Sequence, residues 1–419
     1  MLKMGPKILK KLKNLGFSLP LVVGILAALL VAGTLVYAFP AEWVVADGVT
    51  RAAEEKKAAK PPLALHVATP TAVKGIYMSQ CVVGTPTFRD SLVTFIDTSD
   101  LNSVVIDIKD FTGKIAFKTD NPVLKDSVSD ACGARDMKEF VARLHEKGIY
   151  VIGRITVFQD PYYTKLHPEA AVQSLKINPG MPWKDNKGLS FIDVSSRPYW
   201  DYVVELSRVA HEEFGFDELN YDYIRYPSDG PMSDAGFVNQ NKSEALEQFF
   251  AYLHSKVKPT GVVMSADLFG YVTVLADDLG IGQQLERALP YFDYIMPMVY
   301  PSHYNKGFAG LKNPNSDPYL VVYTSMIEAV RRTVATSSAV HTIGSQPIAS
   351  TSPALFTKLA YPKTAMRPWL QDFDYGKEYT PADIRAQIKA TEDAGLNSWI
   401  FWDAGNKYSS LRLFLAPSP

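Results

Sequence analysis

The sequence has little of what several large classes of protein require. Its formal net charge is −1 and its body carries no block of like charges, so it lacks the basic surface that nucleic-acid binding needs. The seven histidines include no pair with the spacing of a zinc site, and we expect no metal and no other cofactor. The sequence has no G-x-S-x-G motif, which excludes a serine nucleophile held on the strand-to-helix turn that this motif forms. Its glycines form no phosphate-binding loop.

Charge is also absent from a long stretch near the N-terminus. Five lysines lie within residues 3–13, and no charged residue then occurs from 14 to 41. An apolar helix needs about 20 residues to cross a bilayer, and residues 17–39 supply them. We therefore expect residues 1–40 to be a cytoplasmic basic stub and a signal anchor in the lipid bilayer, with the rest of the chain outside. The alternative is a cleaved signal peptide, with Val36 and Ala38 at the cleavage site and a secreted product.

The segment after the anchor is rich in Ala, Lys, Glu and Pro. This composition is typical of a semi-rigid spacer, so residues 41–72 are expected to be a linker. A short helix packed on the body is the alternative, and Pro61, Pro62 and Pro70 disfavour it. The globular domain is then expected to span residues 73–419.

In this domain, β-rich runs alternate with helical patterns. Strands that alternate with helices pair in parallel, and eight such units over about 340 residues fit a (β/α)8, or TIM, barrel. An open doubly wound sheet is the alternative, but "MSQCVVGTPTF" is a poor match to its glycine-rich loop. Residues 335–365 fit no unit cleanly, and "HTIGS" could form an extra strand. The eight expected strands lie within residues 74–80, 103–110, 150–158, 216–227, 261–270, 292–301, 366–373 and 397–405.

Polar and aromatic side chains gather at the C-terminal ends of the expected strands, where a barrel carries its active site. For His303 two interpretations stay open, a sugar ligand and a polar group satisfied within the fold. We expect the following set to bind substrate: Asp107, Lys109, Arg154, Arg225, Tyr300, His303, Trp369, Gln371, Trp402 and Asp403.

Two aspartates stand at the tops of the fourth and fifth expected strands. Glu218, Asn220 and Asp222 alternate with apolar residues, so they share the face that points into the barrel, and Asp222 is the highest. Asp267 ends the corresponding face of the next strand. Two carboxylates on neighbouring strands can converge on one glycosidic bond, where one attacks or stabilises the sugar and the other protonates the leaving oxygen. For each acid taken singly, a structural salt bridge or a helix cap is the alternative.

Buried acids need partners, because an unpaired buried carboxylate is costly. Arg225 or Arg154 would keep one catalytic acid ionised by lowering its pKa. The lower acids of the fourth strand also face inward, and we expect Arg154 or Lys109 on adjacent strands to neutralise them.

The two cysteines, Cys81 and Cys132, fall in the connections after the first and second expected strands. Neighbouring βα loops lie on the same face of a barrel, and two thiols outside the cytoplasm often pair. We therefore expect a disulfide, which requires Cα atoms within about 7 Å. Two separate buried thiols are the alternative.

Five ordered motifs resemble a glycoside hydrolase domain family of bacterial exported proteins: "VKGIYMS", "GFDELNYDYIRYP", "SADLFG", "DYIMPMVYPSHY" and "RPWLQDF". The resemblance runs from about Val73 to Tyr408 and implies a TIM barrel distantly similar to the α-amylase-like hydrolases. It implies a nucleophile at Asp222 and a proton donor at Asp267. The donor on the fifth strand of amylase-like enzymes is usually Glu, and the Asp of this chain has a shorter arm.

We expect a membrane-anchored, extracytoplasmic glycoside hydrolase that cleaves O-glycosidic bonds of a polysaccharide, such as one of the cell envelope. Neighbouring strands lie about 4.8 Å apart. This proximity and the resemblance favour retention of the anomeric configuration, with Asp222 as nucleophile and Asp267 as acid/base. A non-catalytic glycan-binding barrel and a scaffold for envelope proteins are the two alternatives.

Overall fold

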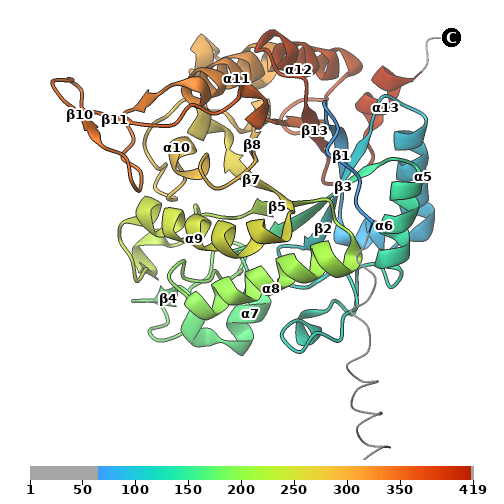
Figure 1. Cartoon of the computed structure of the whole chain (residues 1–419), viewed down its shortest axis with the longest axis horizontal. Helices are drawn as coiled ribbons and strands as arrows, with labels where there is room; N and C mark the ends of the chain where they lie inside the picture. Colours follow the sequence, from blue (N-terminus) through green and yellow to red (C-terminus); the bar gives the residue numbers. More distant parts are fainter. Residues whose placement is uncertain (1–64, 417–419) are drawn as a thin grey trace, which may run out of the picture. The chain divides into compact units, whose positions relative to one another are not determined.

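The structure is a computed structural model, and it describes residues 65–416. Within them, eight parallel strands close into a barrel in the chain order β1, β2, β3, β5, β7, β8, β12 and β13, with β13 pairing again with β1. Figure 1 shows the strands in the middle of the molecule and the helices around them. The expected barrel is confirmed. Its strands are β1 (Lys74–Met78), β2 (Ser103–Lys109), β3 (Tyr150–Thr156), β5 (Glu218–Asp222), β7 (Val263–Phe269), β8 (Tyr294–Met298), β12 (Trp369–Gln371) and β13 (Trp399–Trp402).

The helices follow the strands and turn an apolar face toward them. The longest of the described helices, α8, has Pro198 in its first turn, where a missing N–H costs nothing. It stops at Gly215, whose N–H donates to the carbonyl of His211 and whose φ of 86° turns the N–H of Phe216 back to the carbonyl of Ala210. The helices are α4 (Gln80–Val83), α5 (Pro86–Asp97), α6 (Met137–Glu146), α7 (Pro161–Leu166), α8 (Arg197–Phe214), α9 (Lys242–Val257), α10 (Leu285–Ala288), α11 (Pro318–Val334), α12 (Pro381–Asp393) and α13 (Ser409–Leu415).

Two small antiparallel sheets lie outside the barrel in the described part of the chain. The first pairs β4 (Gln173–Ser174) with β6 (Ala235–Gly236). The second joins β9 (Ser337–Ser338), β10 (Pro347–Ile348) and β11 (Leu355–Thr357), and it projects from the body in Figure 1. This sheet explains why residues 335–365 fit no βα unit. The suggested strand at "HTIGS" is wrong, because these residues lie outside the strands and include a turn.

A buried ion pair crosses the interior of the barrel. Arg367, just before β12, donates from Nη1 to Glu218 Oε1 at 2.8 Å and Oε2 at 3.0 Å. The hydroxyl of Tyr150 donates to the same carboxylate at 3.0 Å. Both charged side chains are fully buried. The expectation that Arg154 or Lys109 neutralises this lower acid is therefore wrong, since Arg367 takes that place.

Residues 65–72, expected to be part of the linker, contact the barrel. The N–H of Val67 donates to Asp217 Oδ1 at 2.8 Å, and the Val67 side chain packs against the apolar cluster inside the barrel. The hydroxyls of Thr69 and Tyr150 lie 3.0 Å apart. Residues 65–72 are thus hydrogen-bonded to the folded body and packed on it, rather than standing apart from it as a spacer.

A protein that begins at residue 73 is expected to fold but to be less stable than one that begins at residue 65. The shorter form loses the burial of Val67 and the hydrogen bonds of Val67 and Thr69, which should lower the free energy of unfolding by about 2–3 kcal/mol. Urea unfolding of both forms, followed by circular dichroism, measures the difference. Equal midpoints would show that the segment contributes nothing to stability.

The expected membrane anchor and most of the expected linker lie outside the described residues. Among the helices within residues 65–416, none is both long and apolar enough to cross a membrane.

The two cysteines form a disulfide between α4 and the connection that follows β2. Their Cα atoms lie 4.4 Å apart. The bond ties together two neighbouring loops at the C-terminal end of the barrel, and both cysteines line a cavity there.

Candidate active site

The register of β5 and β7 brings the two candidate catalytic acids to the same level. Tyr221 pairs with Ala266, so the next residues along the two strands are Asp222 and Asp267. Strand alternation turns both side chains into the barrel, as the sequence predicts. Both are buried at the C-terminal end of their strands.

One guanidinium connects the carboxylates of three strands. Arg154 on β3 donates from Nη1 to Asp107 Oδ1 at 2.5 Å and from Nε to Asp222 Oδ2 at 3.1 Å. Its Nε also lies 3.9 Å from Asp267 Oδ2. The Oδ2 atoms of Asp222 and Asp267 are therefore within about 7 Å of each other, a separation open to both retaining and inverting glycosidases. The expected cation beside the acids is Arg154.

Asp267 differs from Asp222 in its surroundings. Its Oδ1 accepts hydrogen bonds from Asn220 Nδ2 at 2.8 Å and Trp369 Nε1 at 2.7 Å. Burial, followed by the negative charge of Asp222, raises the pKa of Asp267 well above its usual value. Asp267 thus favours the protonated form, while Asp222 is in direct contact with Arg154. Such a difference between two neighbouring carboxyls marks an acid and its charged partner.

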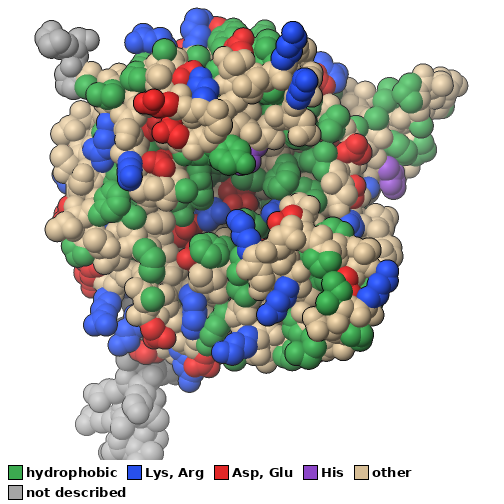
Figure 2. Space-filling model, turned by 180° about the vertical axis from the view of Figure 1, so that it is seen from behind, with side chains coloured by type: hydrophobic (Ala, Val, Ile, Leu, Met, Phe, Trp, Pro, Cys, Tyr) green, Lys and Arg blue, Asp and Glu red, His purple; other side chains and the backbone are tan. Residues whose placement is uncertain are grey.

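The pair opens into a cavity of about 450 Å³, which we call the catalytic cavity. Aromatic rings form much of its wall, and Figure 2 shows a hollow with charged side chains in it and hydrophobic ones around it. Its lining consists of Arg154, Asp222, Tyr223, Arg225, Asp267, Phe269, Gly270, Tyr271, Met298, Tyr300, His303, Tyr304, Trp369 and Trp402.

Most of the predicted substrate-binding residues lie at this cavity, including Arg225, Tyr300, Trp369 and Trp402. His303 also lines it. Its Nδ1 is 2.9 Å from the hydroxyl of Ser302, and burial lowers its pKa, which favours the neutral ring. Asp107 lines the neighbouring larger cavity, where it accepts from Tyr77 and Arg154.

Three of the residues predicted to bind substrate, Lys109, Gln371 and Asp403, line neither cavity and have partners within the fold. Lys109 is fully buried and its Nζ lies 2.9 Å from Asp160 Oδ2. Gln371 accepts from the hydroxyl of Ser302 at 2.9 Å and so supports the loop after β8. Asp403 accepts backbone N–H groups of residues 405, 407 and 408, and so shapes the turn after β13.

Other residues at the site were not predicted to be functional. Asn220 could have been found from strand alternation, because it shares the inward face with Asp222 and donates to Asp267. No pattern along β1 indicates a role for Tyr77, because its contact at the site is a hydrogen bond from its hydroxyl to Asp107 on another strand. Tyr223 lines the cavity with a φ of 51°, a conformation uncommon for a side chain of its size.

Across residues 65–416, no group of three or more His, Cys, Asp or Glu side chains gathers in a way that could hold a metal ion. The groups that line the site are the carboxyl groups of Asp222 and Asp267, the guanidinium groups of Arg154 and Arg225, and a wall of aromatic rings.

A further buried acid near the barrel mouth, Asp372, should make the stability of the fold depend on pH. Burial raises the pKa of Asp372 to about 7. Between about pH 4 and pH 7 the folded protein therefore keeps a proton that the unfolded chain releases, so stability falls as pH rises through this window. Asp372→Asn is expected to remove this loss, which should be about 2–4 kcal/mol between pH 4 and pH 8. Urea unfolding at both pH values measures it.

The exposed substitution Asp90→Asn is the control, and it should leave the difference between the two pH values unchanged. An Asp372→Asn protein with the same pH dependence as the wild type would contradict the prediction.

Comparison with known proteins gives one family match and a set of similar structures. A family model described as "Putative glycosyl hydrolase domain" matches residues 75–408. None of the curated proteins compared with the chain matches it.

Three solved structures illustrate the structural likeness. The glycoside hydrolase domain of PgaB (BpsB) from Bordetella bronchiseptica has a TM-score of 0.54 and 14% identity, covering 83% of this chain and 100% of its own. Alpha-L-fucosidase isoenzyme 2 from Paenibacillus thiaminolyticus has a TM-score of 0.55 and 11% identity, covering 83% of this chain and 49% of its own. A hypothetical protein from Ruminiclostridium thermocellum ATCC 27405 is 28% identical over 49% of this chain and 98% of its own, with a TM-score of 0.41.

The first two likenesses, at low identity, show the fold. The family match extends from the second residue of β1 to the residue before α13, so it includes seven barrel strands in full, all but the first residue of β1, and both Asp222 and Asp267. The chain belongs to the family described as "Putative glycosyl hydrolase domain".

Proposed function

We propose that the protein is a retaining glycoside hydrolase that cleaves O-glycosidic bonds of a polysaccharide outside the cytoplasm. The observation that carries the proposal is the pairing of Asp222 with Asp267. The two acids share one guanidinium on adjacent strands, yet one is ion-paired and the other favours its proton. Family membership and the aromatic wall of the catalytic cavity support the same reaction class.

The two carboxyl groups divide the reaction between them. Asp267 gives its proton to the glycosidic oxygen as the bond to the leaving sugar breaks, while a carboxylate oxygen of Asp222 bonds to the anomeric carbon. Asp267, now ionised, takes a proton from water. The water oxygen then displaces Asp222, which restores both groups and the original anomeric configuration. Asn220 and Trp369 position Asp267 through its Oδ1.

The membrane-anchored location is part of the proposal. The lysines before an uncharged stretch of the sequence support it, because such a pattern places the following domain outside the cytoplasm. A disulfide between Cys81 and Cys132 is compatible with an oxidising compartment.

Hydrolysis of a polysaccharide panel, with the first-released anomer read by NMR, tests the proposal. We expect product with the configuration of the substrate, and a rate that falls as pH rises and Asp267 loses its proton. Initial release of the opposite anomer would assign Asp222 to activation of water instead. Absence of hydrolysis across the panel would contradict the enzymatic proposal.

A non-catalytic glycan-binding barrel is the second candidate, and one contact favours it. Both oxygens of Asp222 are engaged, Oδ2 by Arg154 and Oδ1 by the N–H of Tyr223 at 2.5 Å. Contacts at both oxygens draw negative charge away from the carboxylate and so lower its nucleophilicity toward a sugar. Tight glycan binding with no turnover by the unmodified protein would support this candidate.

A further inference from the structure

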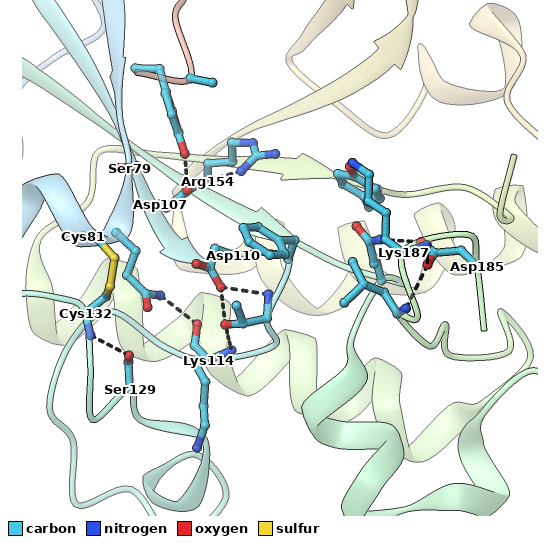
Figure 3. Close-up of a pocket in the computed structure, with 18 of the residues that line it drawn as sticks. Ser79, Cys81, Asp107, Asp110, Lys114, Ser129, Cys132, Arg154, Asp185 and Lys187 are labelled. Carbon is cyan, nitrogen blue, oxygen red and sulfur yellow. Dashed lines mark hydrogen bonds and ion pairs between the residues drawn. A yellow bond between two sulfur atoms is a disulfide. The ribbon is translucent and has the colours of Figure 1, made fainter. Parts of the chain in front are cut away.

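The catalytic cavity adjoins a larger cavity of about 950 Å³, which we call the flanking cavity. Arg154, Tyr223, Arg225 and Trp402 line both, so the two form one groove across the C-terminal end of the barrel. Figure 3 shows the flanking cavity, with Arg154 and Asp107 between its two sides. The proposed bond cleavage uses only the catalytic cavity, which leaves the flanking cavity to be explained.

We propose that the flanking cavity binds two or more further sugar units of a polysaccharide chain that carries no acidic groups. The inference rests on the proposed function, because it extends the same groove. The flanking cavity has about twice the volume of the catalytic cavity. If one sugar unit fills the catalytic cavity, two more fit in the flanking cavity. The volume of the flanking cavity, about 950 Å³, lies within the range of about 300–1,000 Å³ that ligand sites span.

Gln159 supplies a buried acceptor for such a chain. Its side-chain Nε2 donates to Asp185 Oδ2 at 3.3 Å, which fixes the amide orientation, because the amide oxygen would repel that carboxylate. Its Oε1 has no hydrogen-bond partner within the described residues, although Gln159 is only 4% exposed. An unpaired buried acceptor costs about 1–3 kcal/mol. Gln159 lines the flanking cavity, and a small turn of its side chain would present this oxygen to a hydroxyl or amide N–H of a bound sugar.

An exposed aromatic residue, Phe111, also lines the flanking cavity. Asp110 and Lys114 lie on one side in Figure 3, and Asp185 and Lys187 lie on the other. Phe111 follows Asp110 and is 53% exposed. Its ring is available to the apolar face of a sugar, as aromatic side chains often are at binding surfaces. The Cys81–Cys132 disulfide ties the loops of this side together.

The charge of the whole groove argues against an anionic chain. Seven aspartates and four lysines or arginines line the two cavities together. Arg154 is already engaged by Asp107 and Asp222. Arg225 is buried and donates to the carbonyl of Tyr226 and to Ser228. A polyanion would therefore meet more negative than positive charge, and its binding would be repelled.

Binding to the full-length chain in detergent micelles tests the proposal, with Asp222→Asn introduced so that ligands are not cleaved. The probes are di- and tetrasaccharides of α-1,4-glucose, β-1,4-glucose and β-1,4-N-acetylglucosamine, with tetragalacturonate as the anionic probe. By isothermal titration calorimetry, at least one neutral tetrasaccharide should bind about 10-fold or more tightly than its disaccharide, which corresponds to about 1.4 kcal/mol. Tetragalacturonate should bind more weakly.

Two further substitutions locate the added affinity. Gln159→Leu and Phe111→Ala should each lower tetrasaccharide affinity by about 3- to 10-fold and disaccharide affinity by less than about 2-fold. Phe111 is exposed, so its variant tests the proposal even if Gln159→Leu fails to fold. Equal affinity for both lengths, no binding of any neutral tetrasaccharide, equal effects of the substitutions on both lengths, or preference for tetragalacturonate would overturn the proposal.

The result can be separated from that of the proposed function. Length-dependent binding without turnover by the unmodified protein would overturn hydrolysis and leave the flanking site. Turnover with no effect of chain length on affinity would overturn the flanking site and leave the proposed hydrolysis in place.

Discussion

Asp222→Asn is expected to lower kcat for the polysaccharide that the protein cleaves best by about 10⁴-fold or more, the scale of loss when an enzyme's nucleophile or its partner is removed. The amide has nearly the shape of the carboxyl group but cannot bond to the anomeric carbon as a charged nucleophile. Arg154 keeps its contact with Asp107 in the variant, so the barrel should stay folded. Initial rates of reducing-end release measure the effect, and thermal unfolding checks the fold.

Two comparisons make this prediction specific. Asp90→Asn, an exposed substitution on α5, should keep the rate of the unmodified protein. Azide added to Asp222→Gly should restore part of the activity and give a glycosyl azide of inverted configuration, because the small anion occupies the place of the missing carboxylate. Full activity in Asp222→Asn would overturn the site itself.

Arg367→Met is expected to lower the free energy of unfolding by about 3–5 kcal/mol, because it leaves Glu218 buried without its cation. The pair is fully buried inside the barrel, and the hydroxyl of Tyr150 alone would then face the carboxylate. Urea unfolding followed by tryptophan fluorescence measures the loss.

The double variant Arg367→Met, Glu218→Gln should recover most of this stability. Nε and Nη2 of Arg367 have no hydrogen-bond partner within the described residues, so the intact pair satisfies its own charges incompletely. Removing both charges then costs less than removing one. Arg331→Met, the same change in an exposed pair with Glu328, is the control and should cost about 1 kcal/mol or less. A double variant as unstable as Arg367→Met would contradict the prediction.

The sequence alone was sufficient for the barrel and for its two central acids. Alternation of β-rich and helical runs predicts eight βα units, because each pattern has its own period and each element buries one face. The period of two along a strand then predicts that Asp222 and Asp267 face inward, and the parallel register brings them level. The inward direction of each acid follows from the alternation of residues within its own strand, which involves only residues close in sequence.

Lys109 shows where local periodicity fails. In a regular strand it would share the inward face of Asp107, but the pairing of β2 with β3 shifts between these residues, so that Asp107 pairs with Arg154 and Lys109 with Ile155. Such an irregularity breaks the alternation of faces. The side chain of Lys109 meets Asp160 instead of the cavity.

The partners of buried charges were decided only by the tertiary structure. Glu218 pairs with Arg367, which is 149 residues away in the sequence. From the sequence, Arg154 and Lys109 on nearby strands were equally plausible partners. The same holds for the flanking cavity, whose walls are loops after different strands and whose unpaired Gln159 oxygen is visible only when its surroundings are known. Strand periodicity determines which way a side chain points, whereas its contacts depend on how distant loops pack around the barrel.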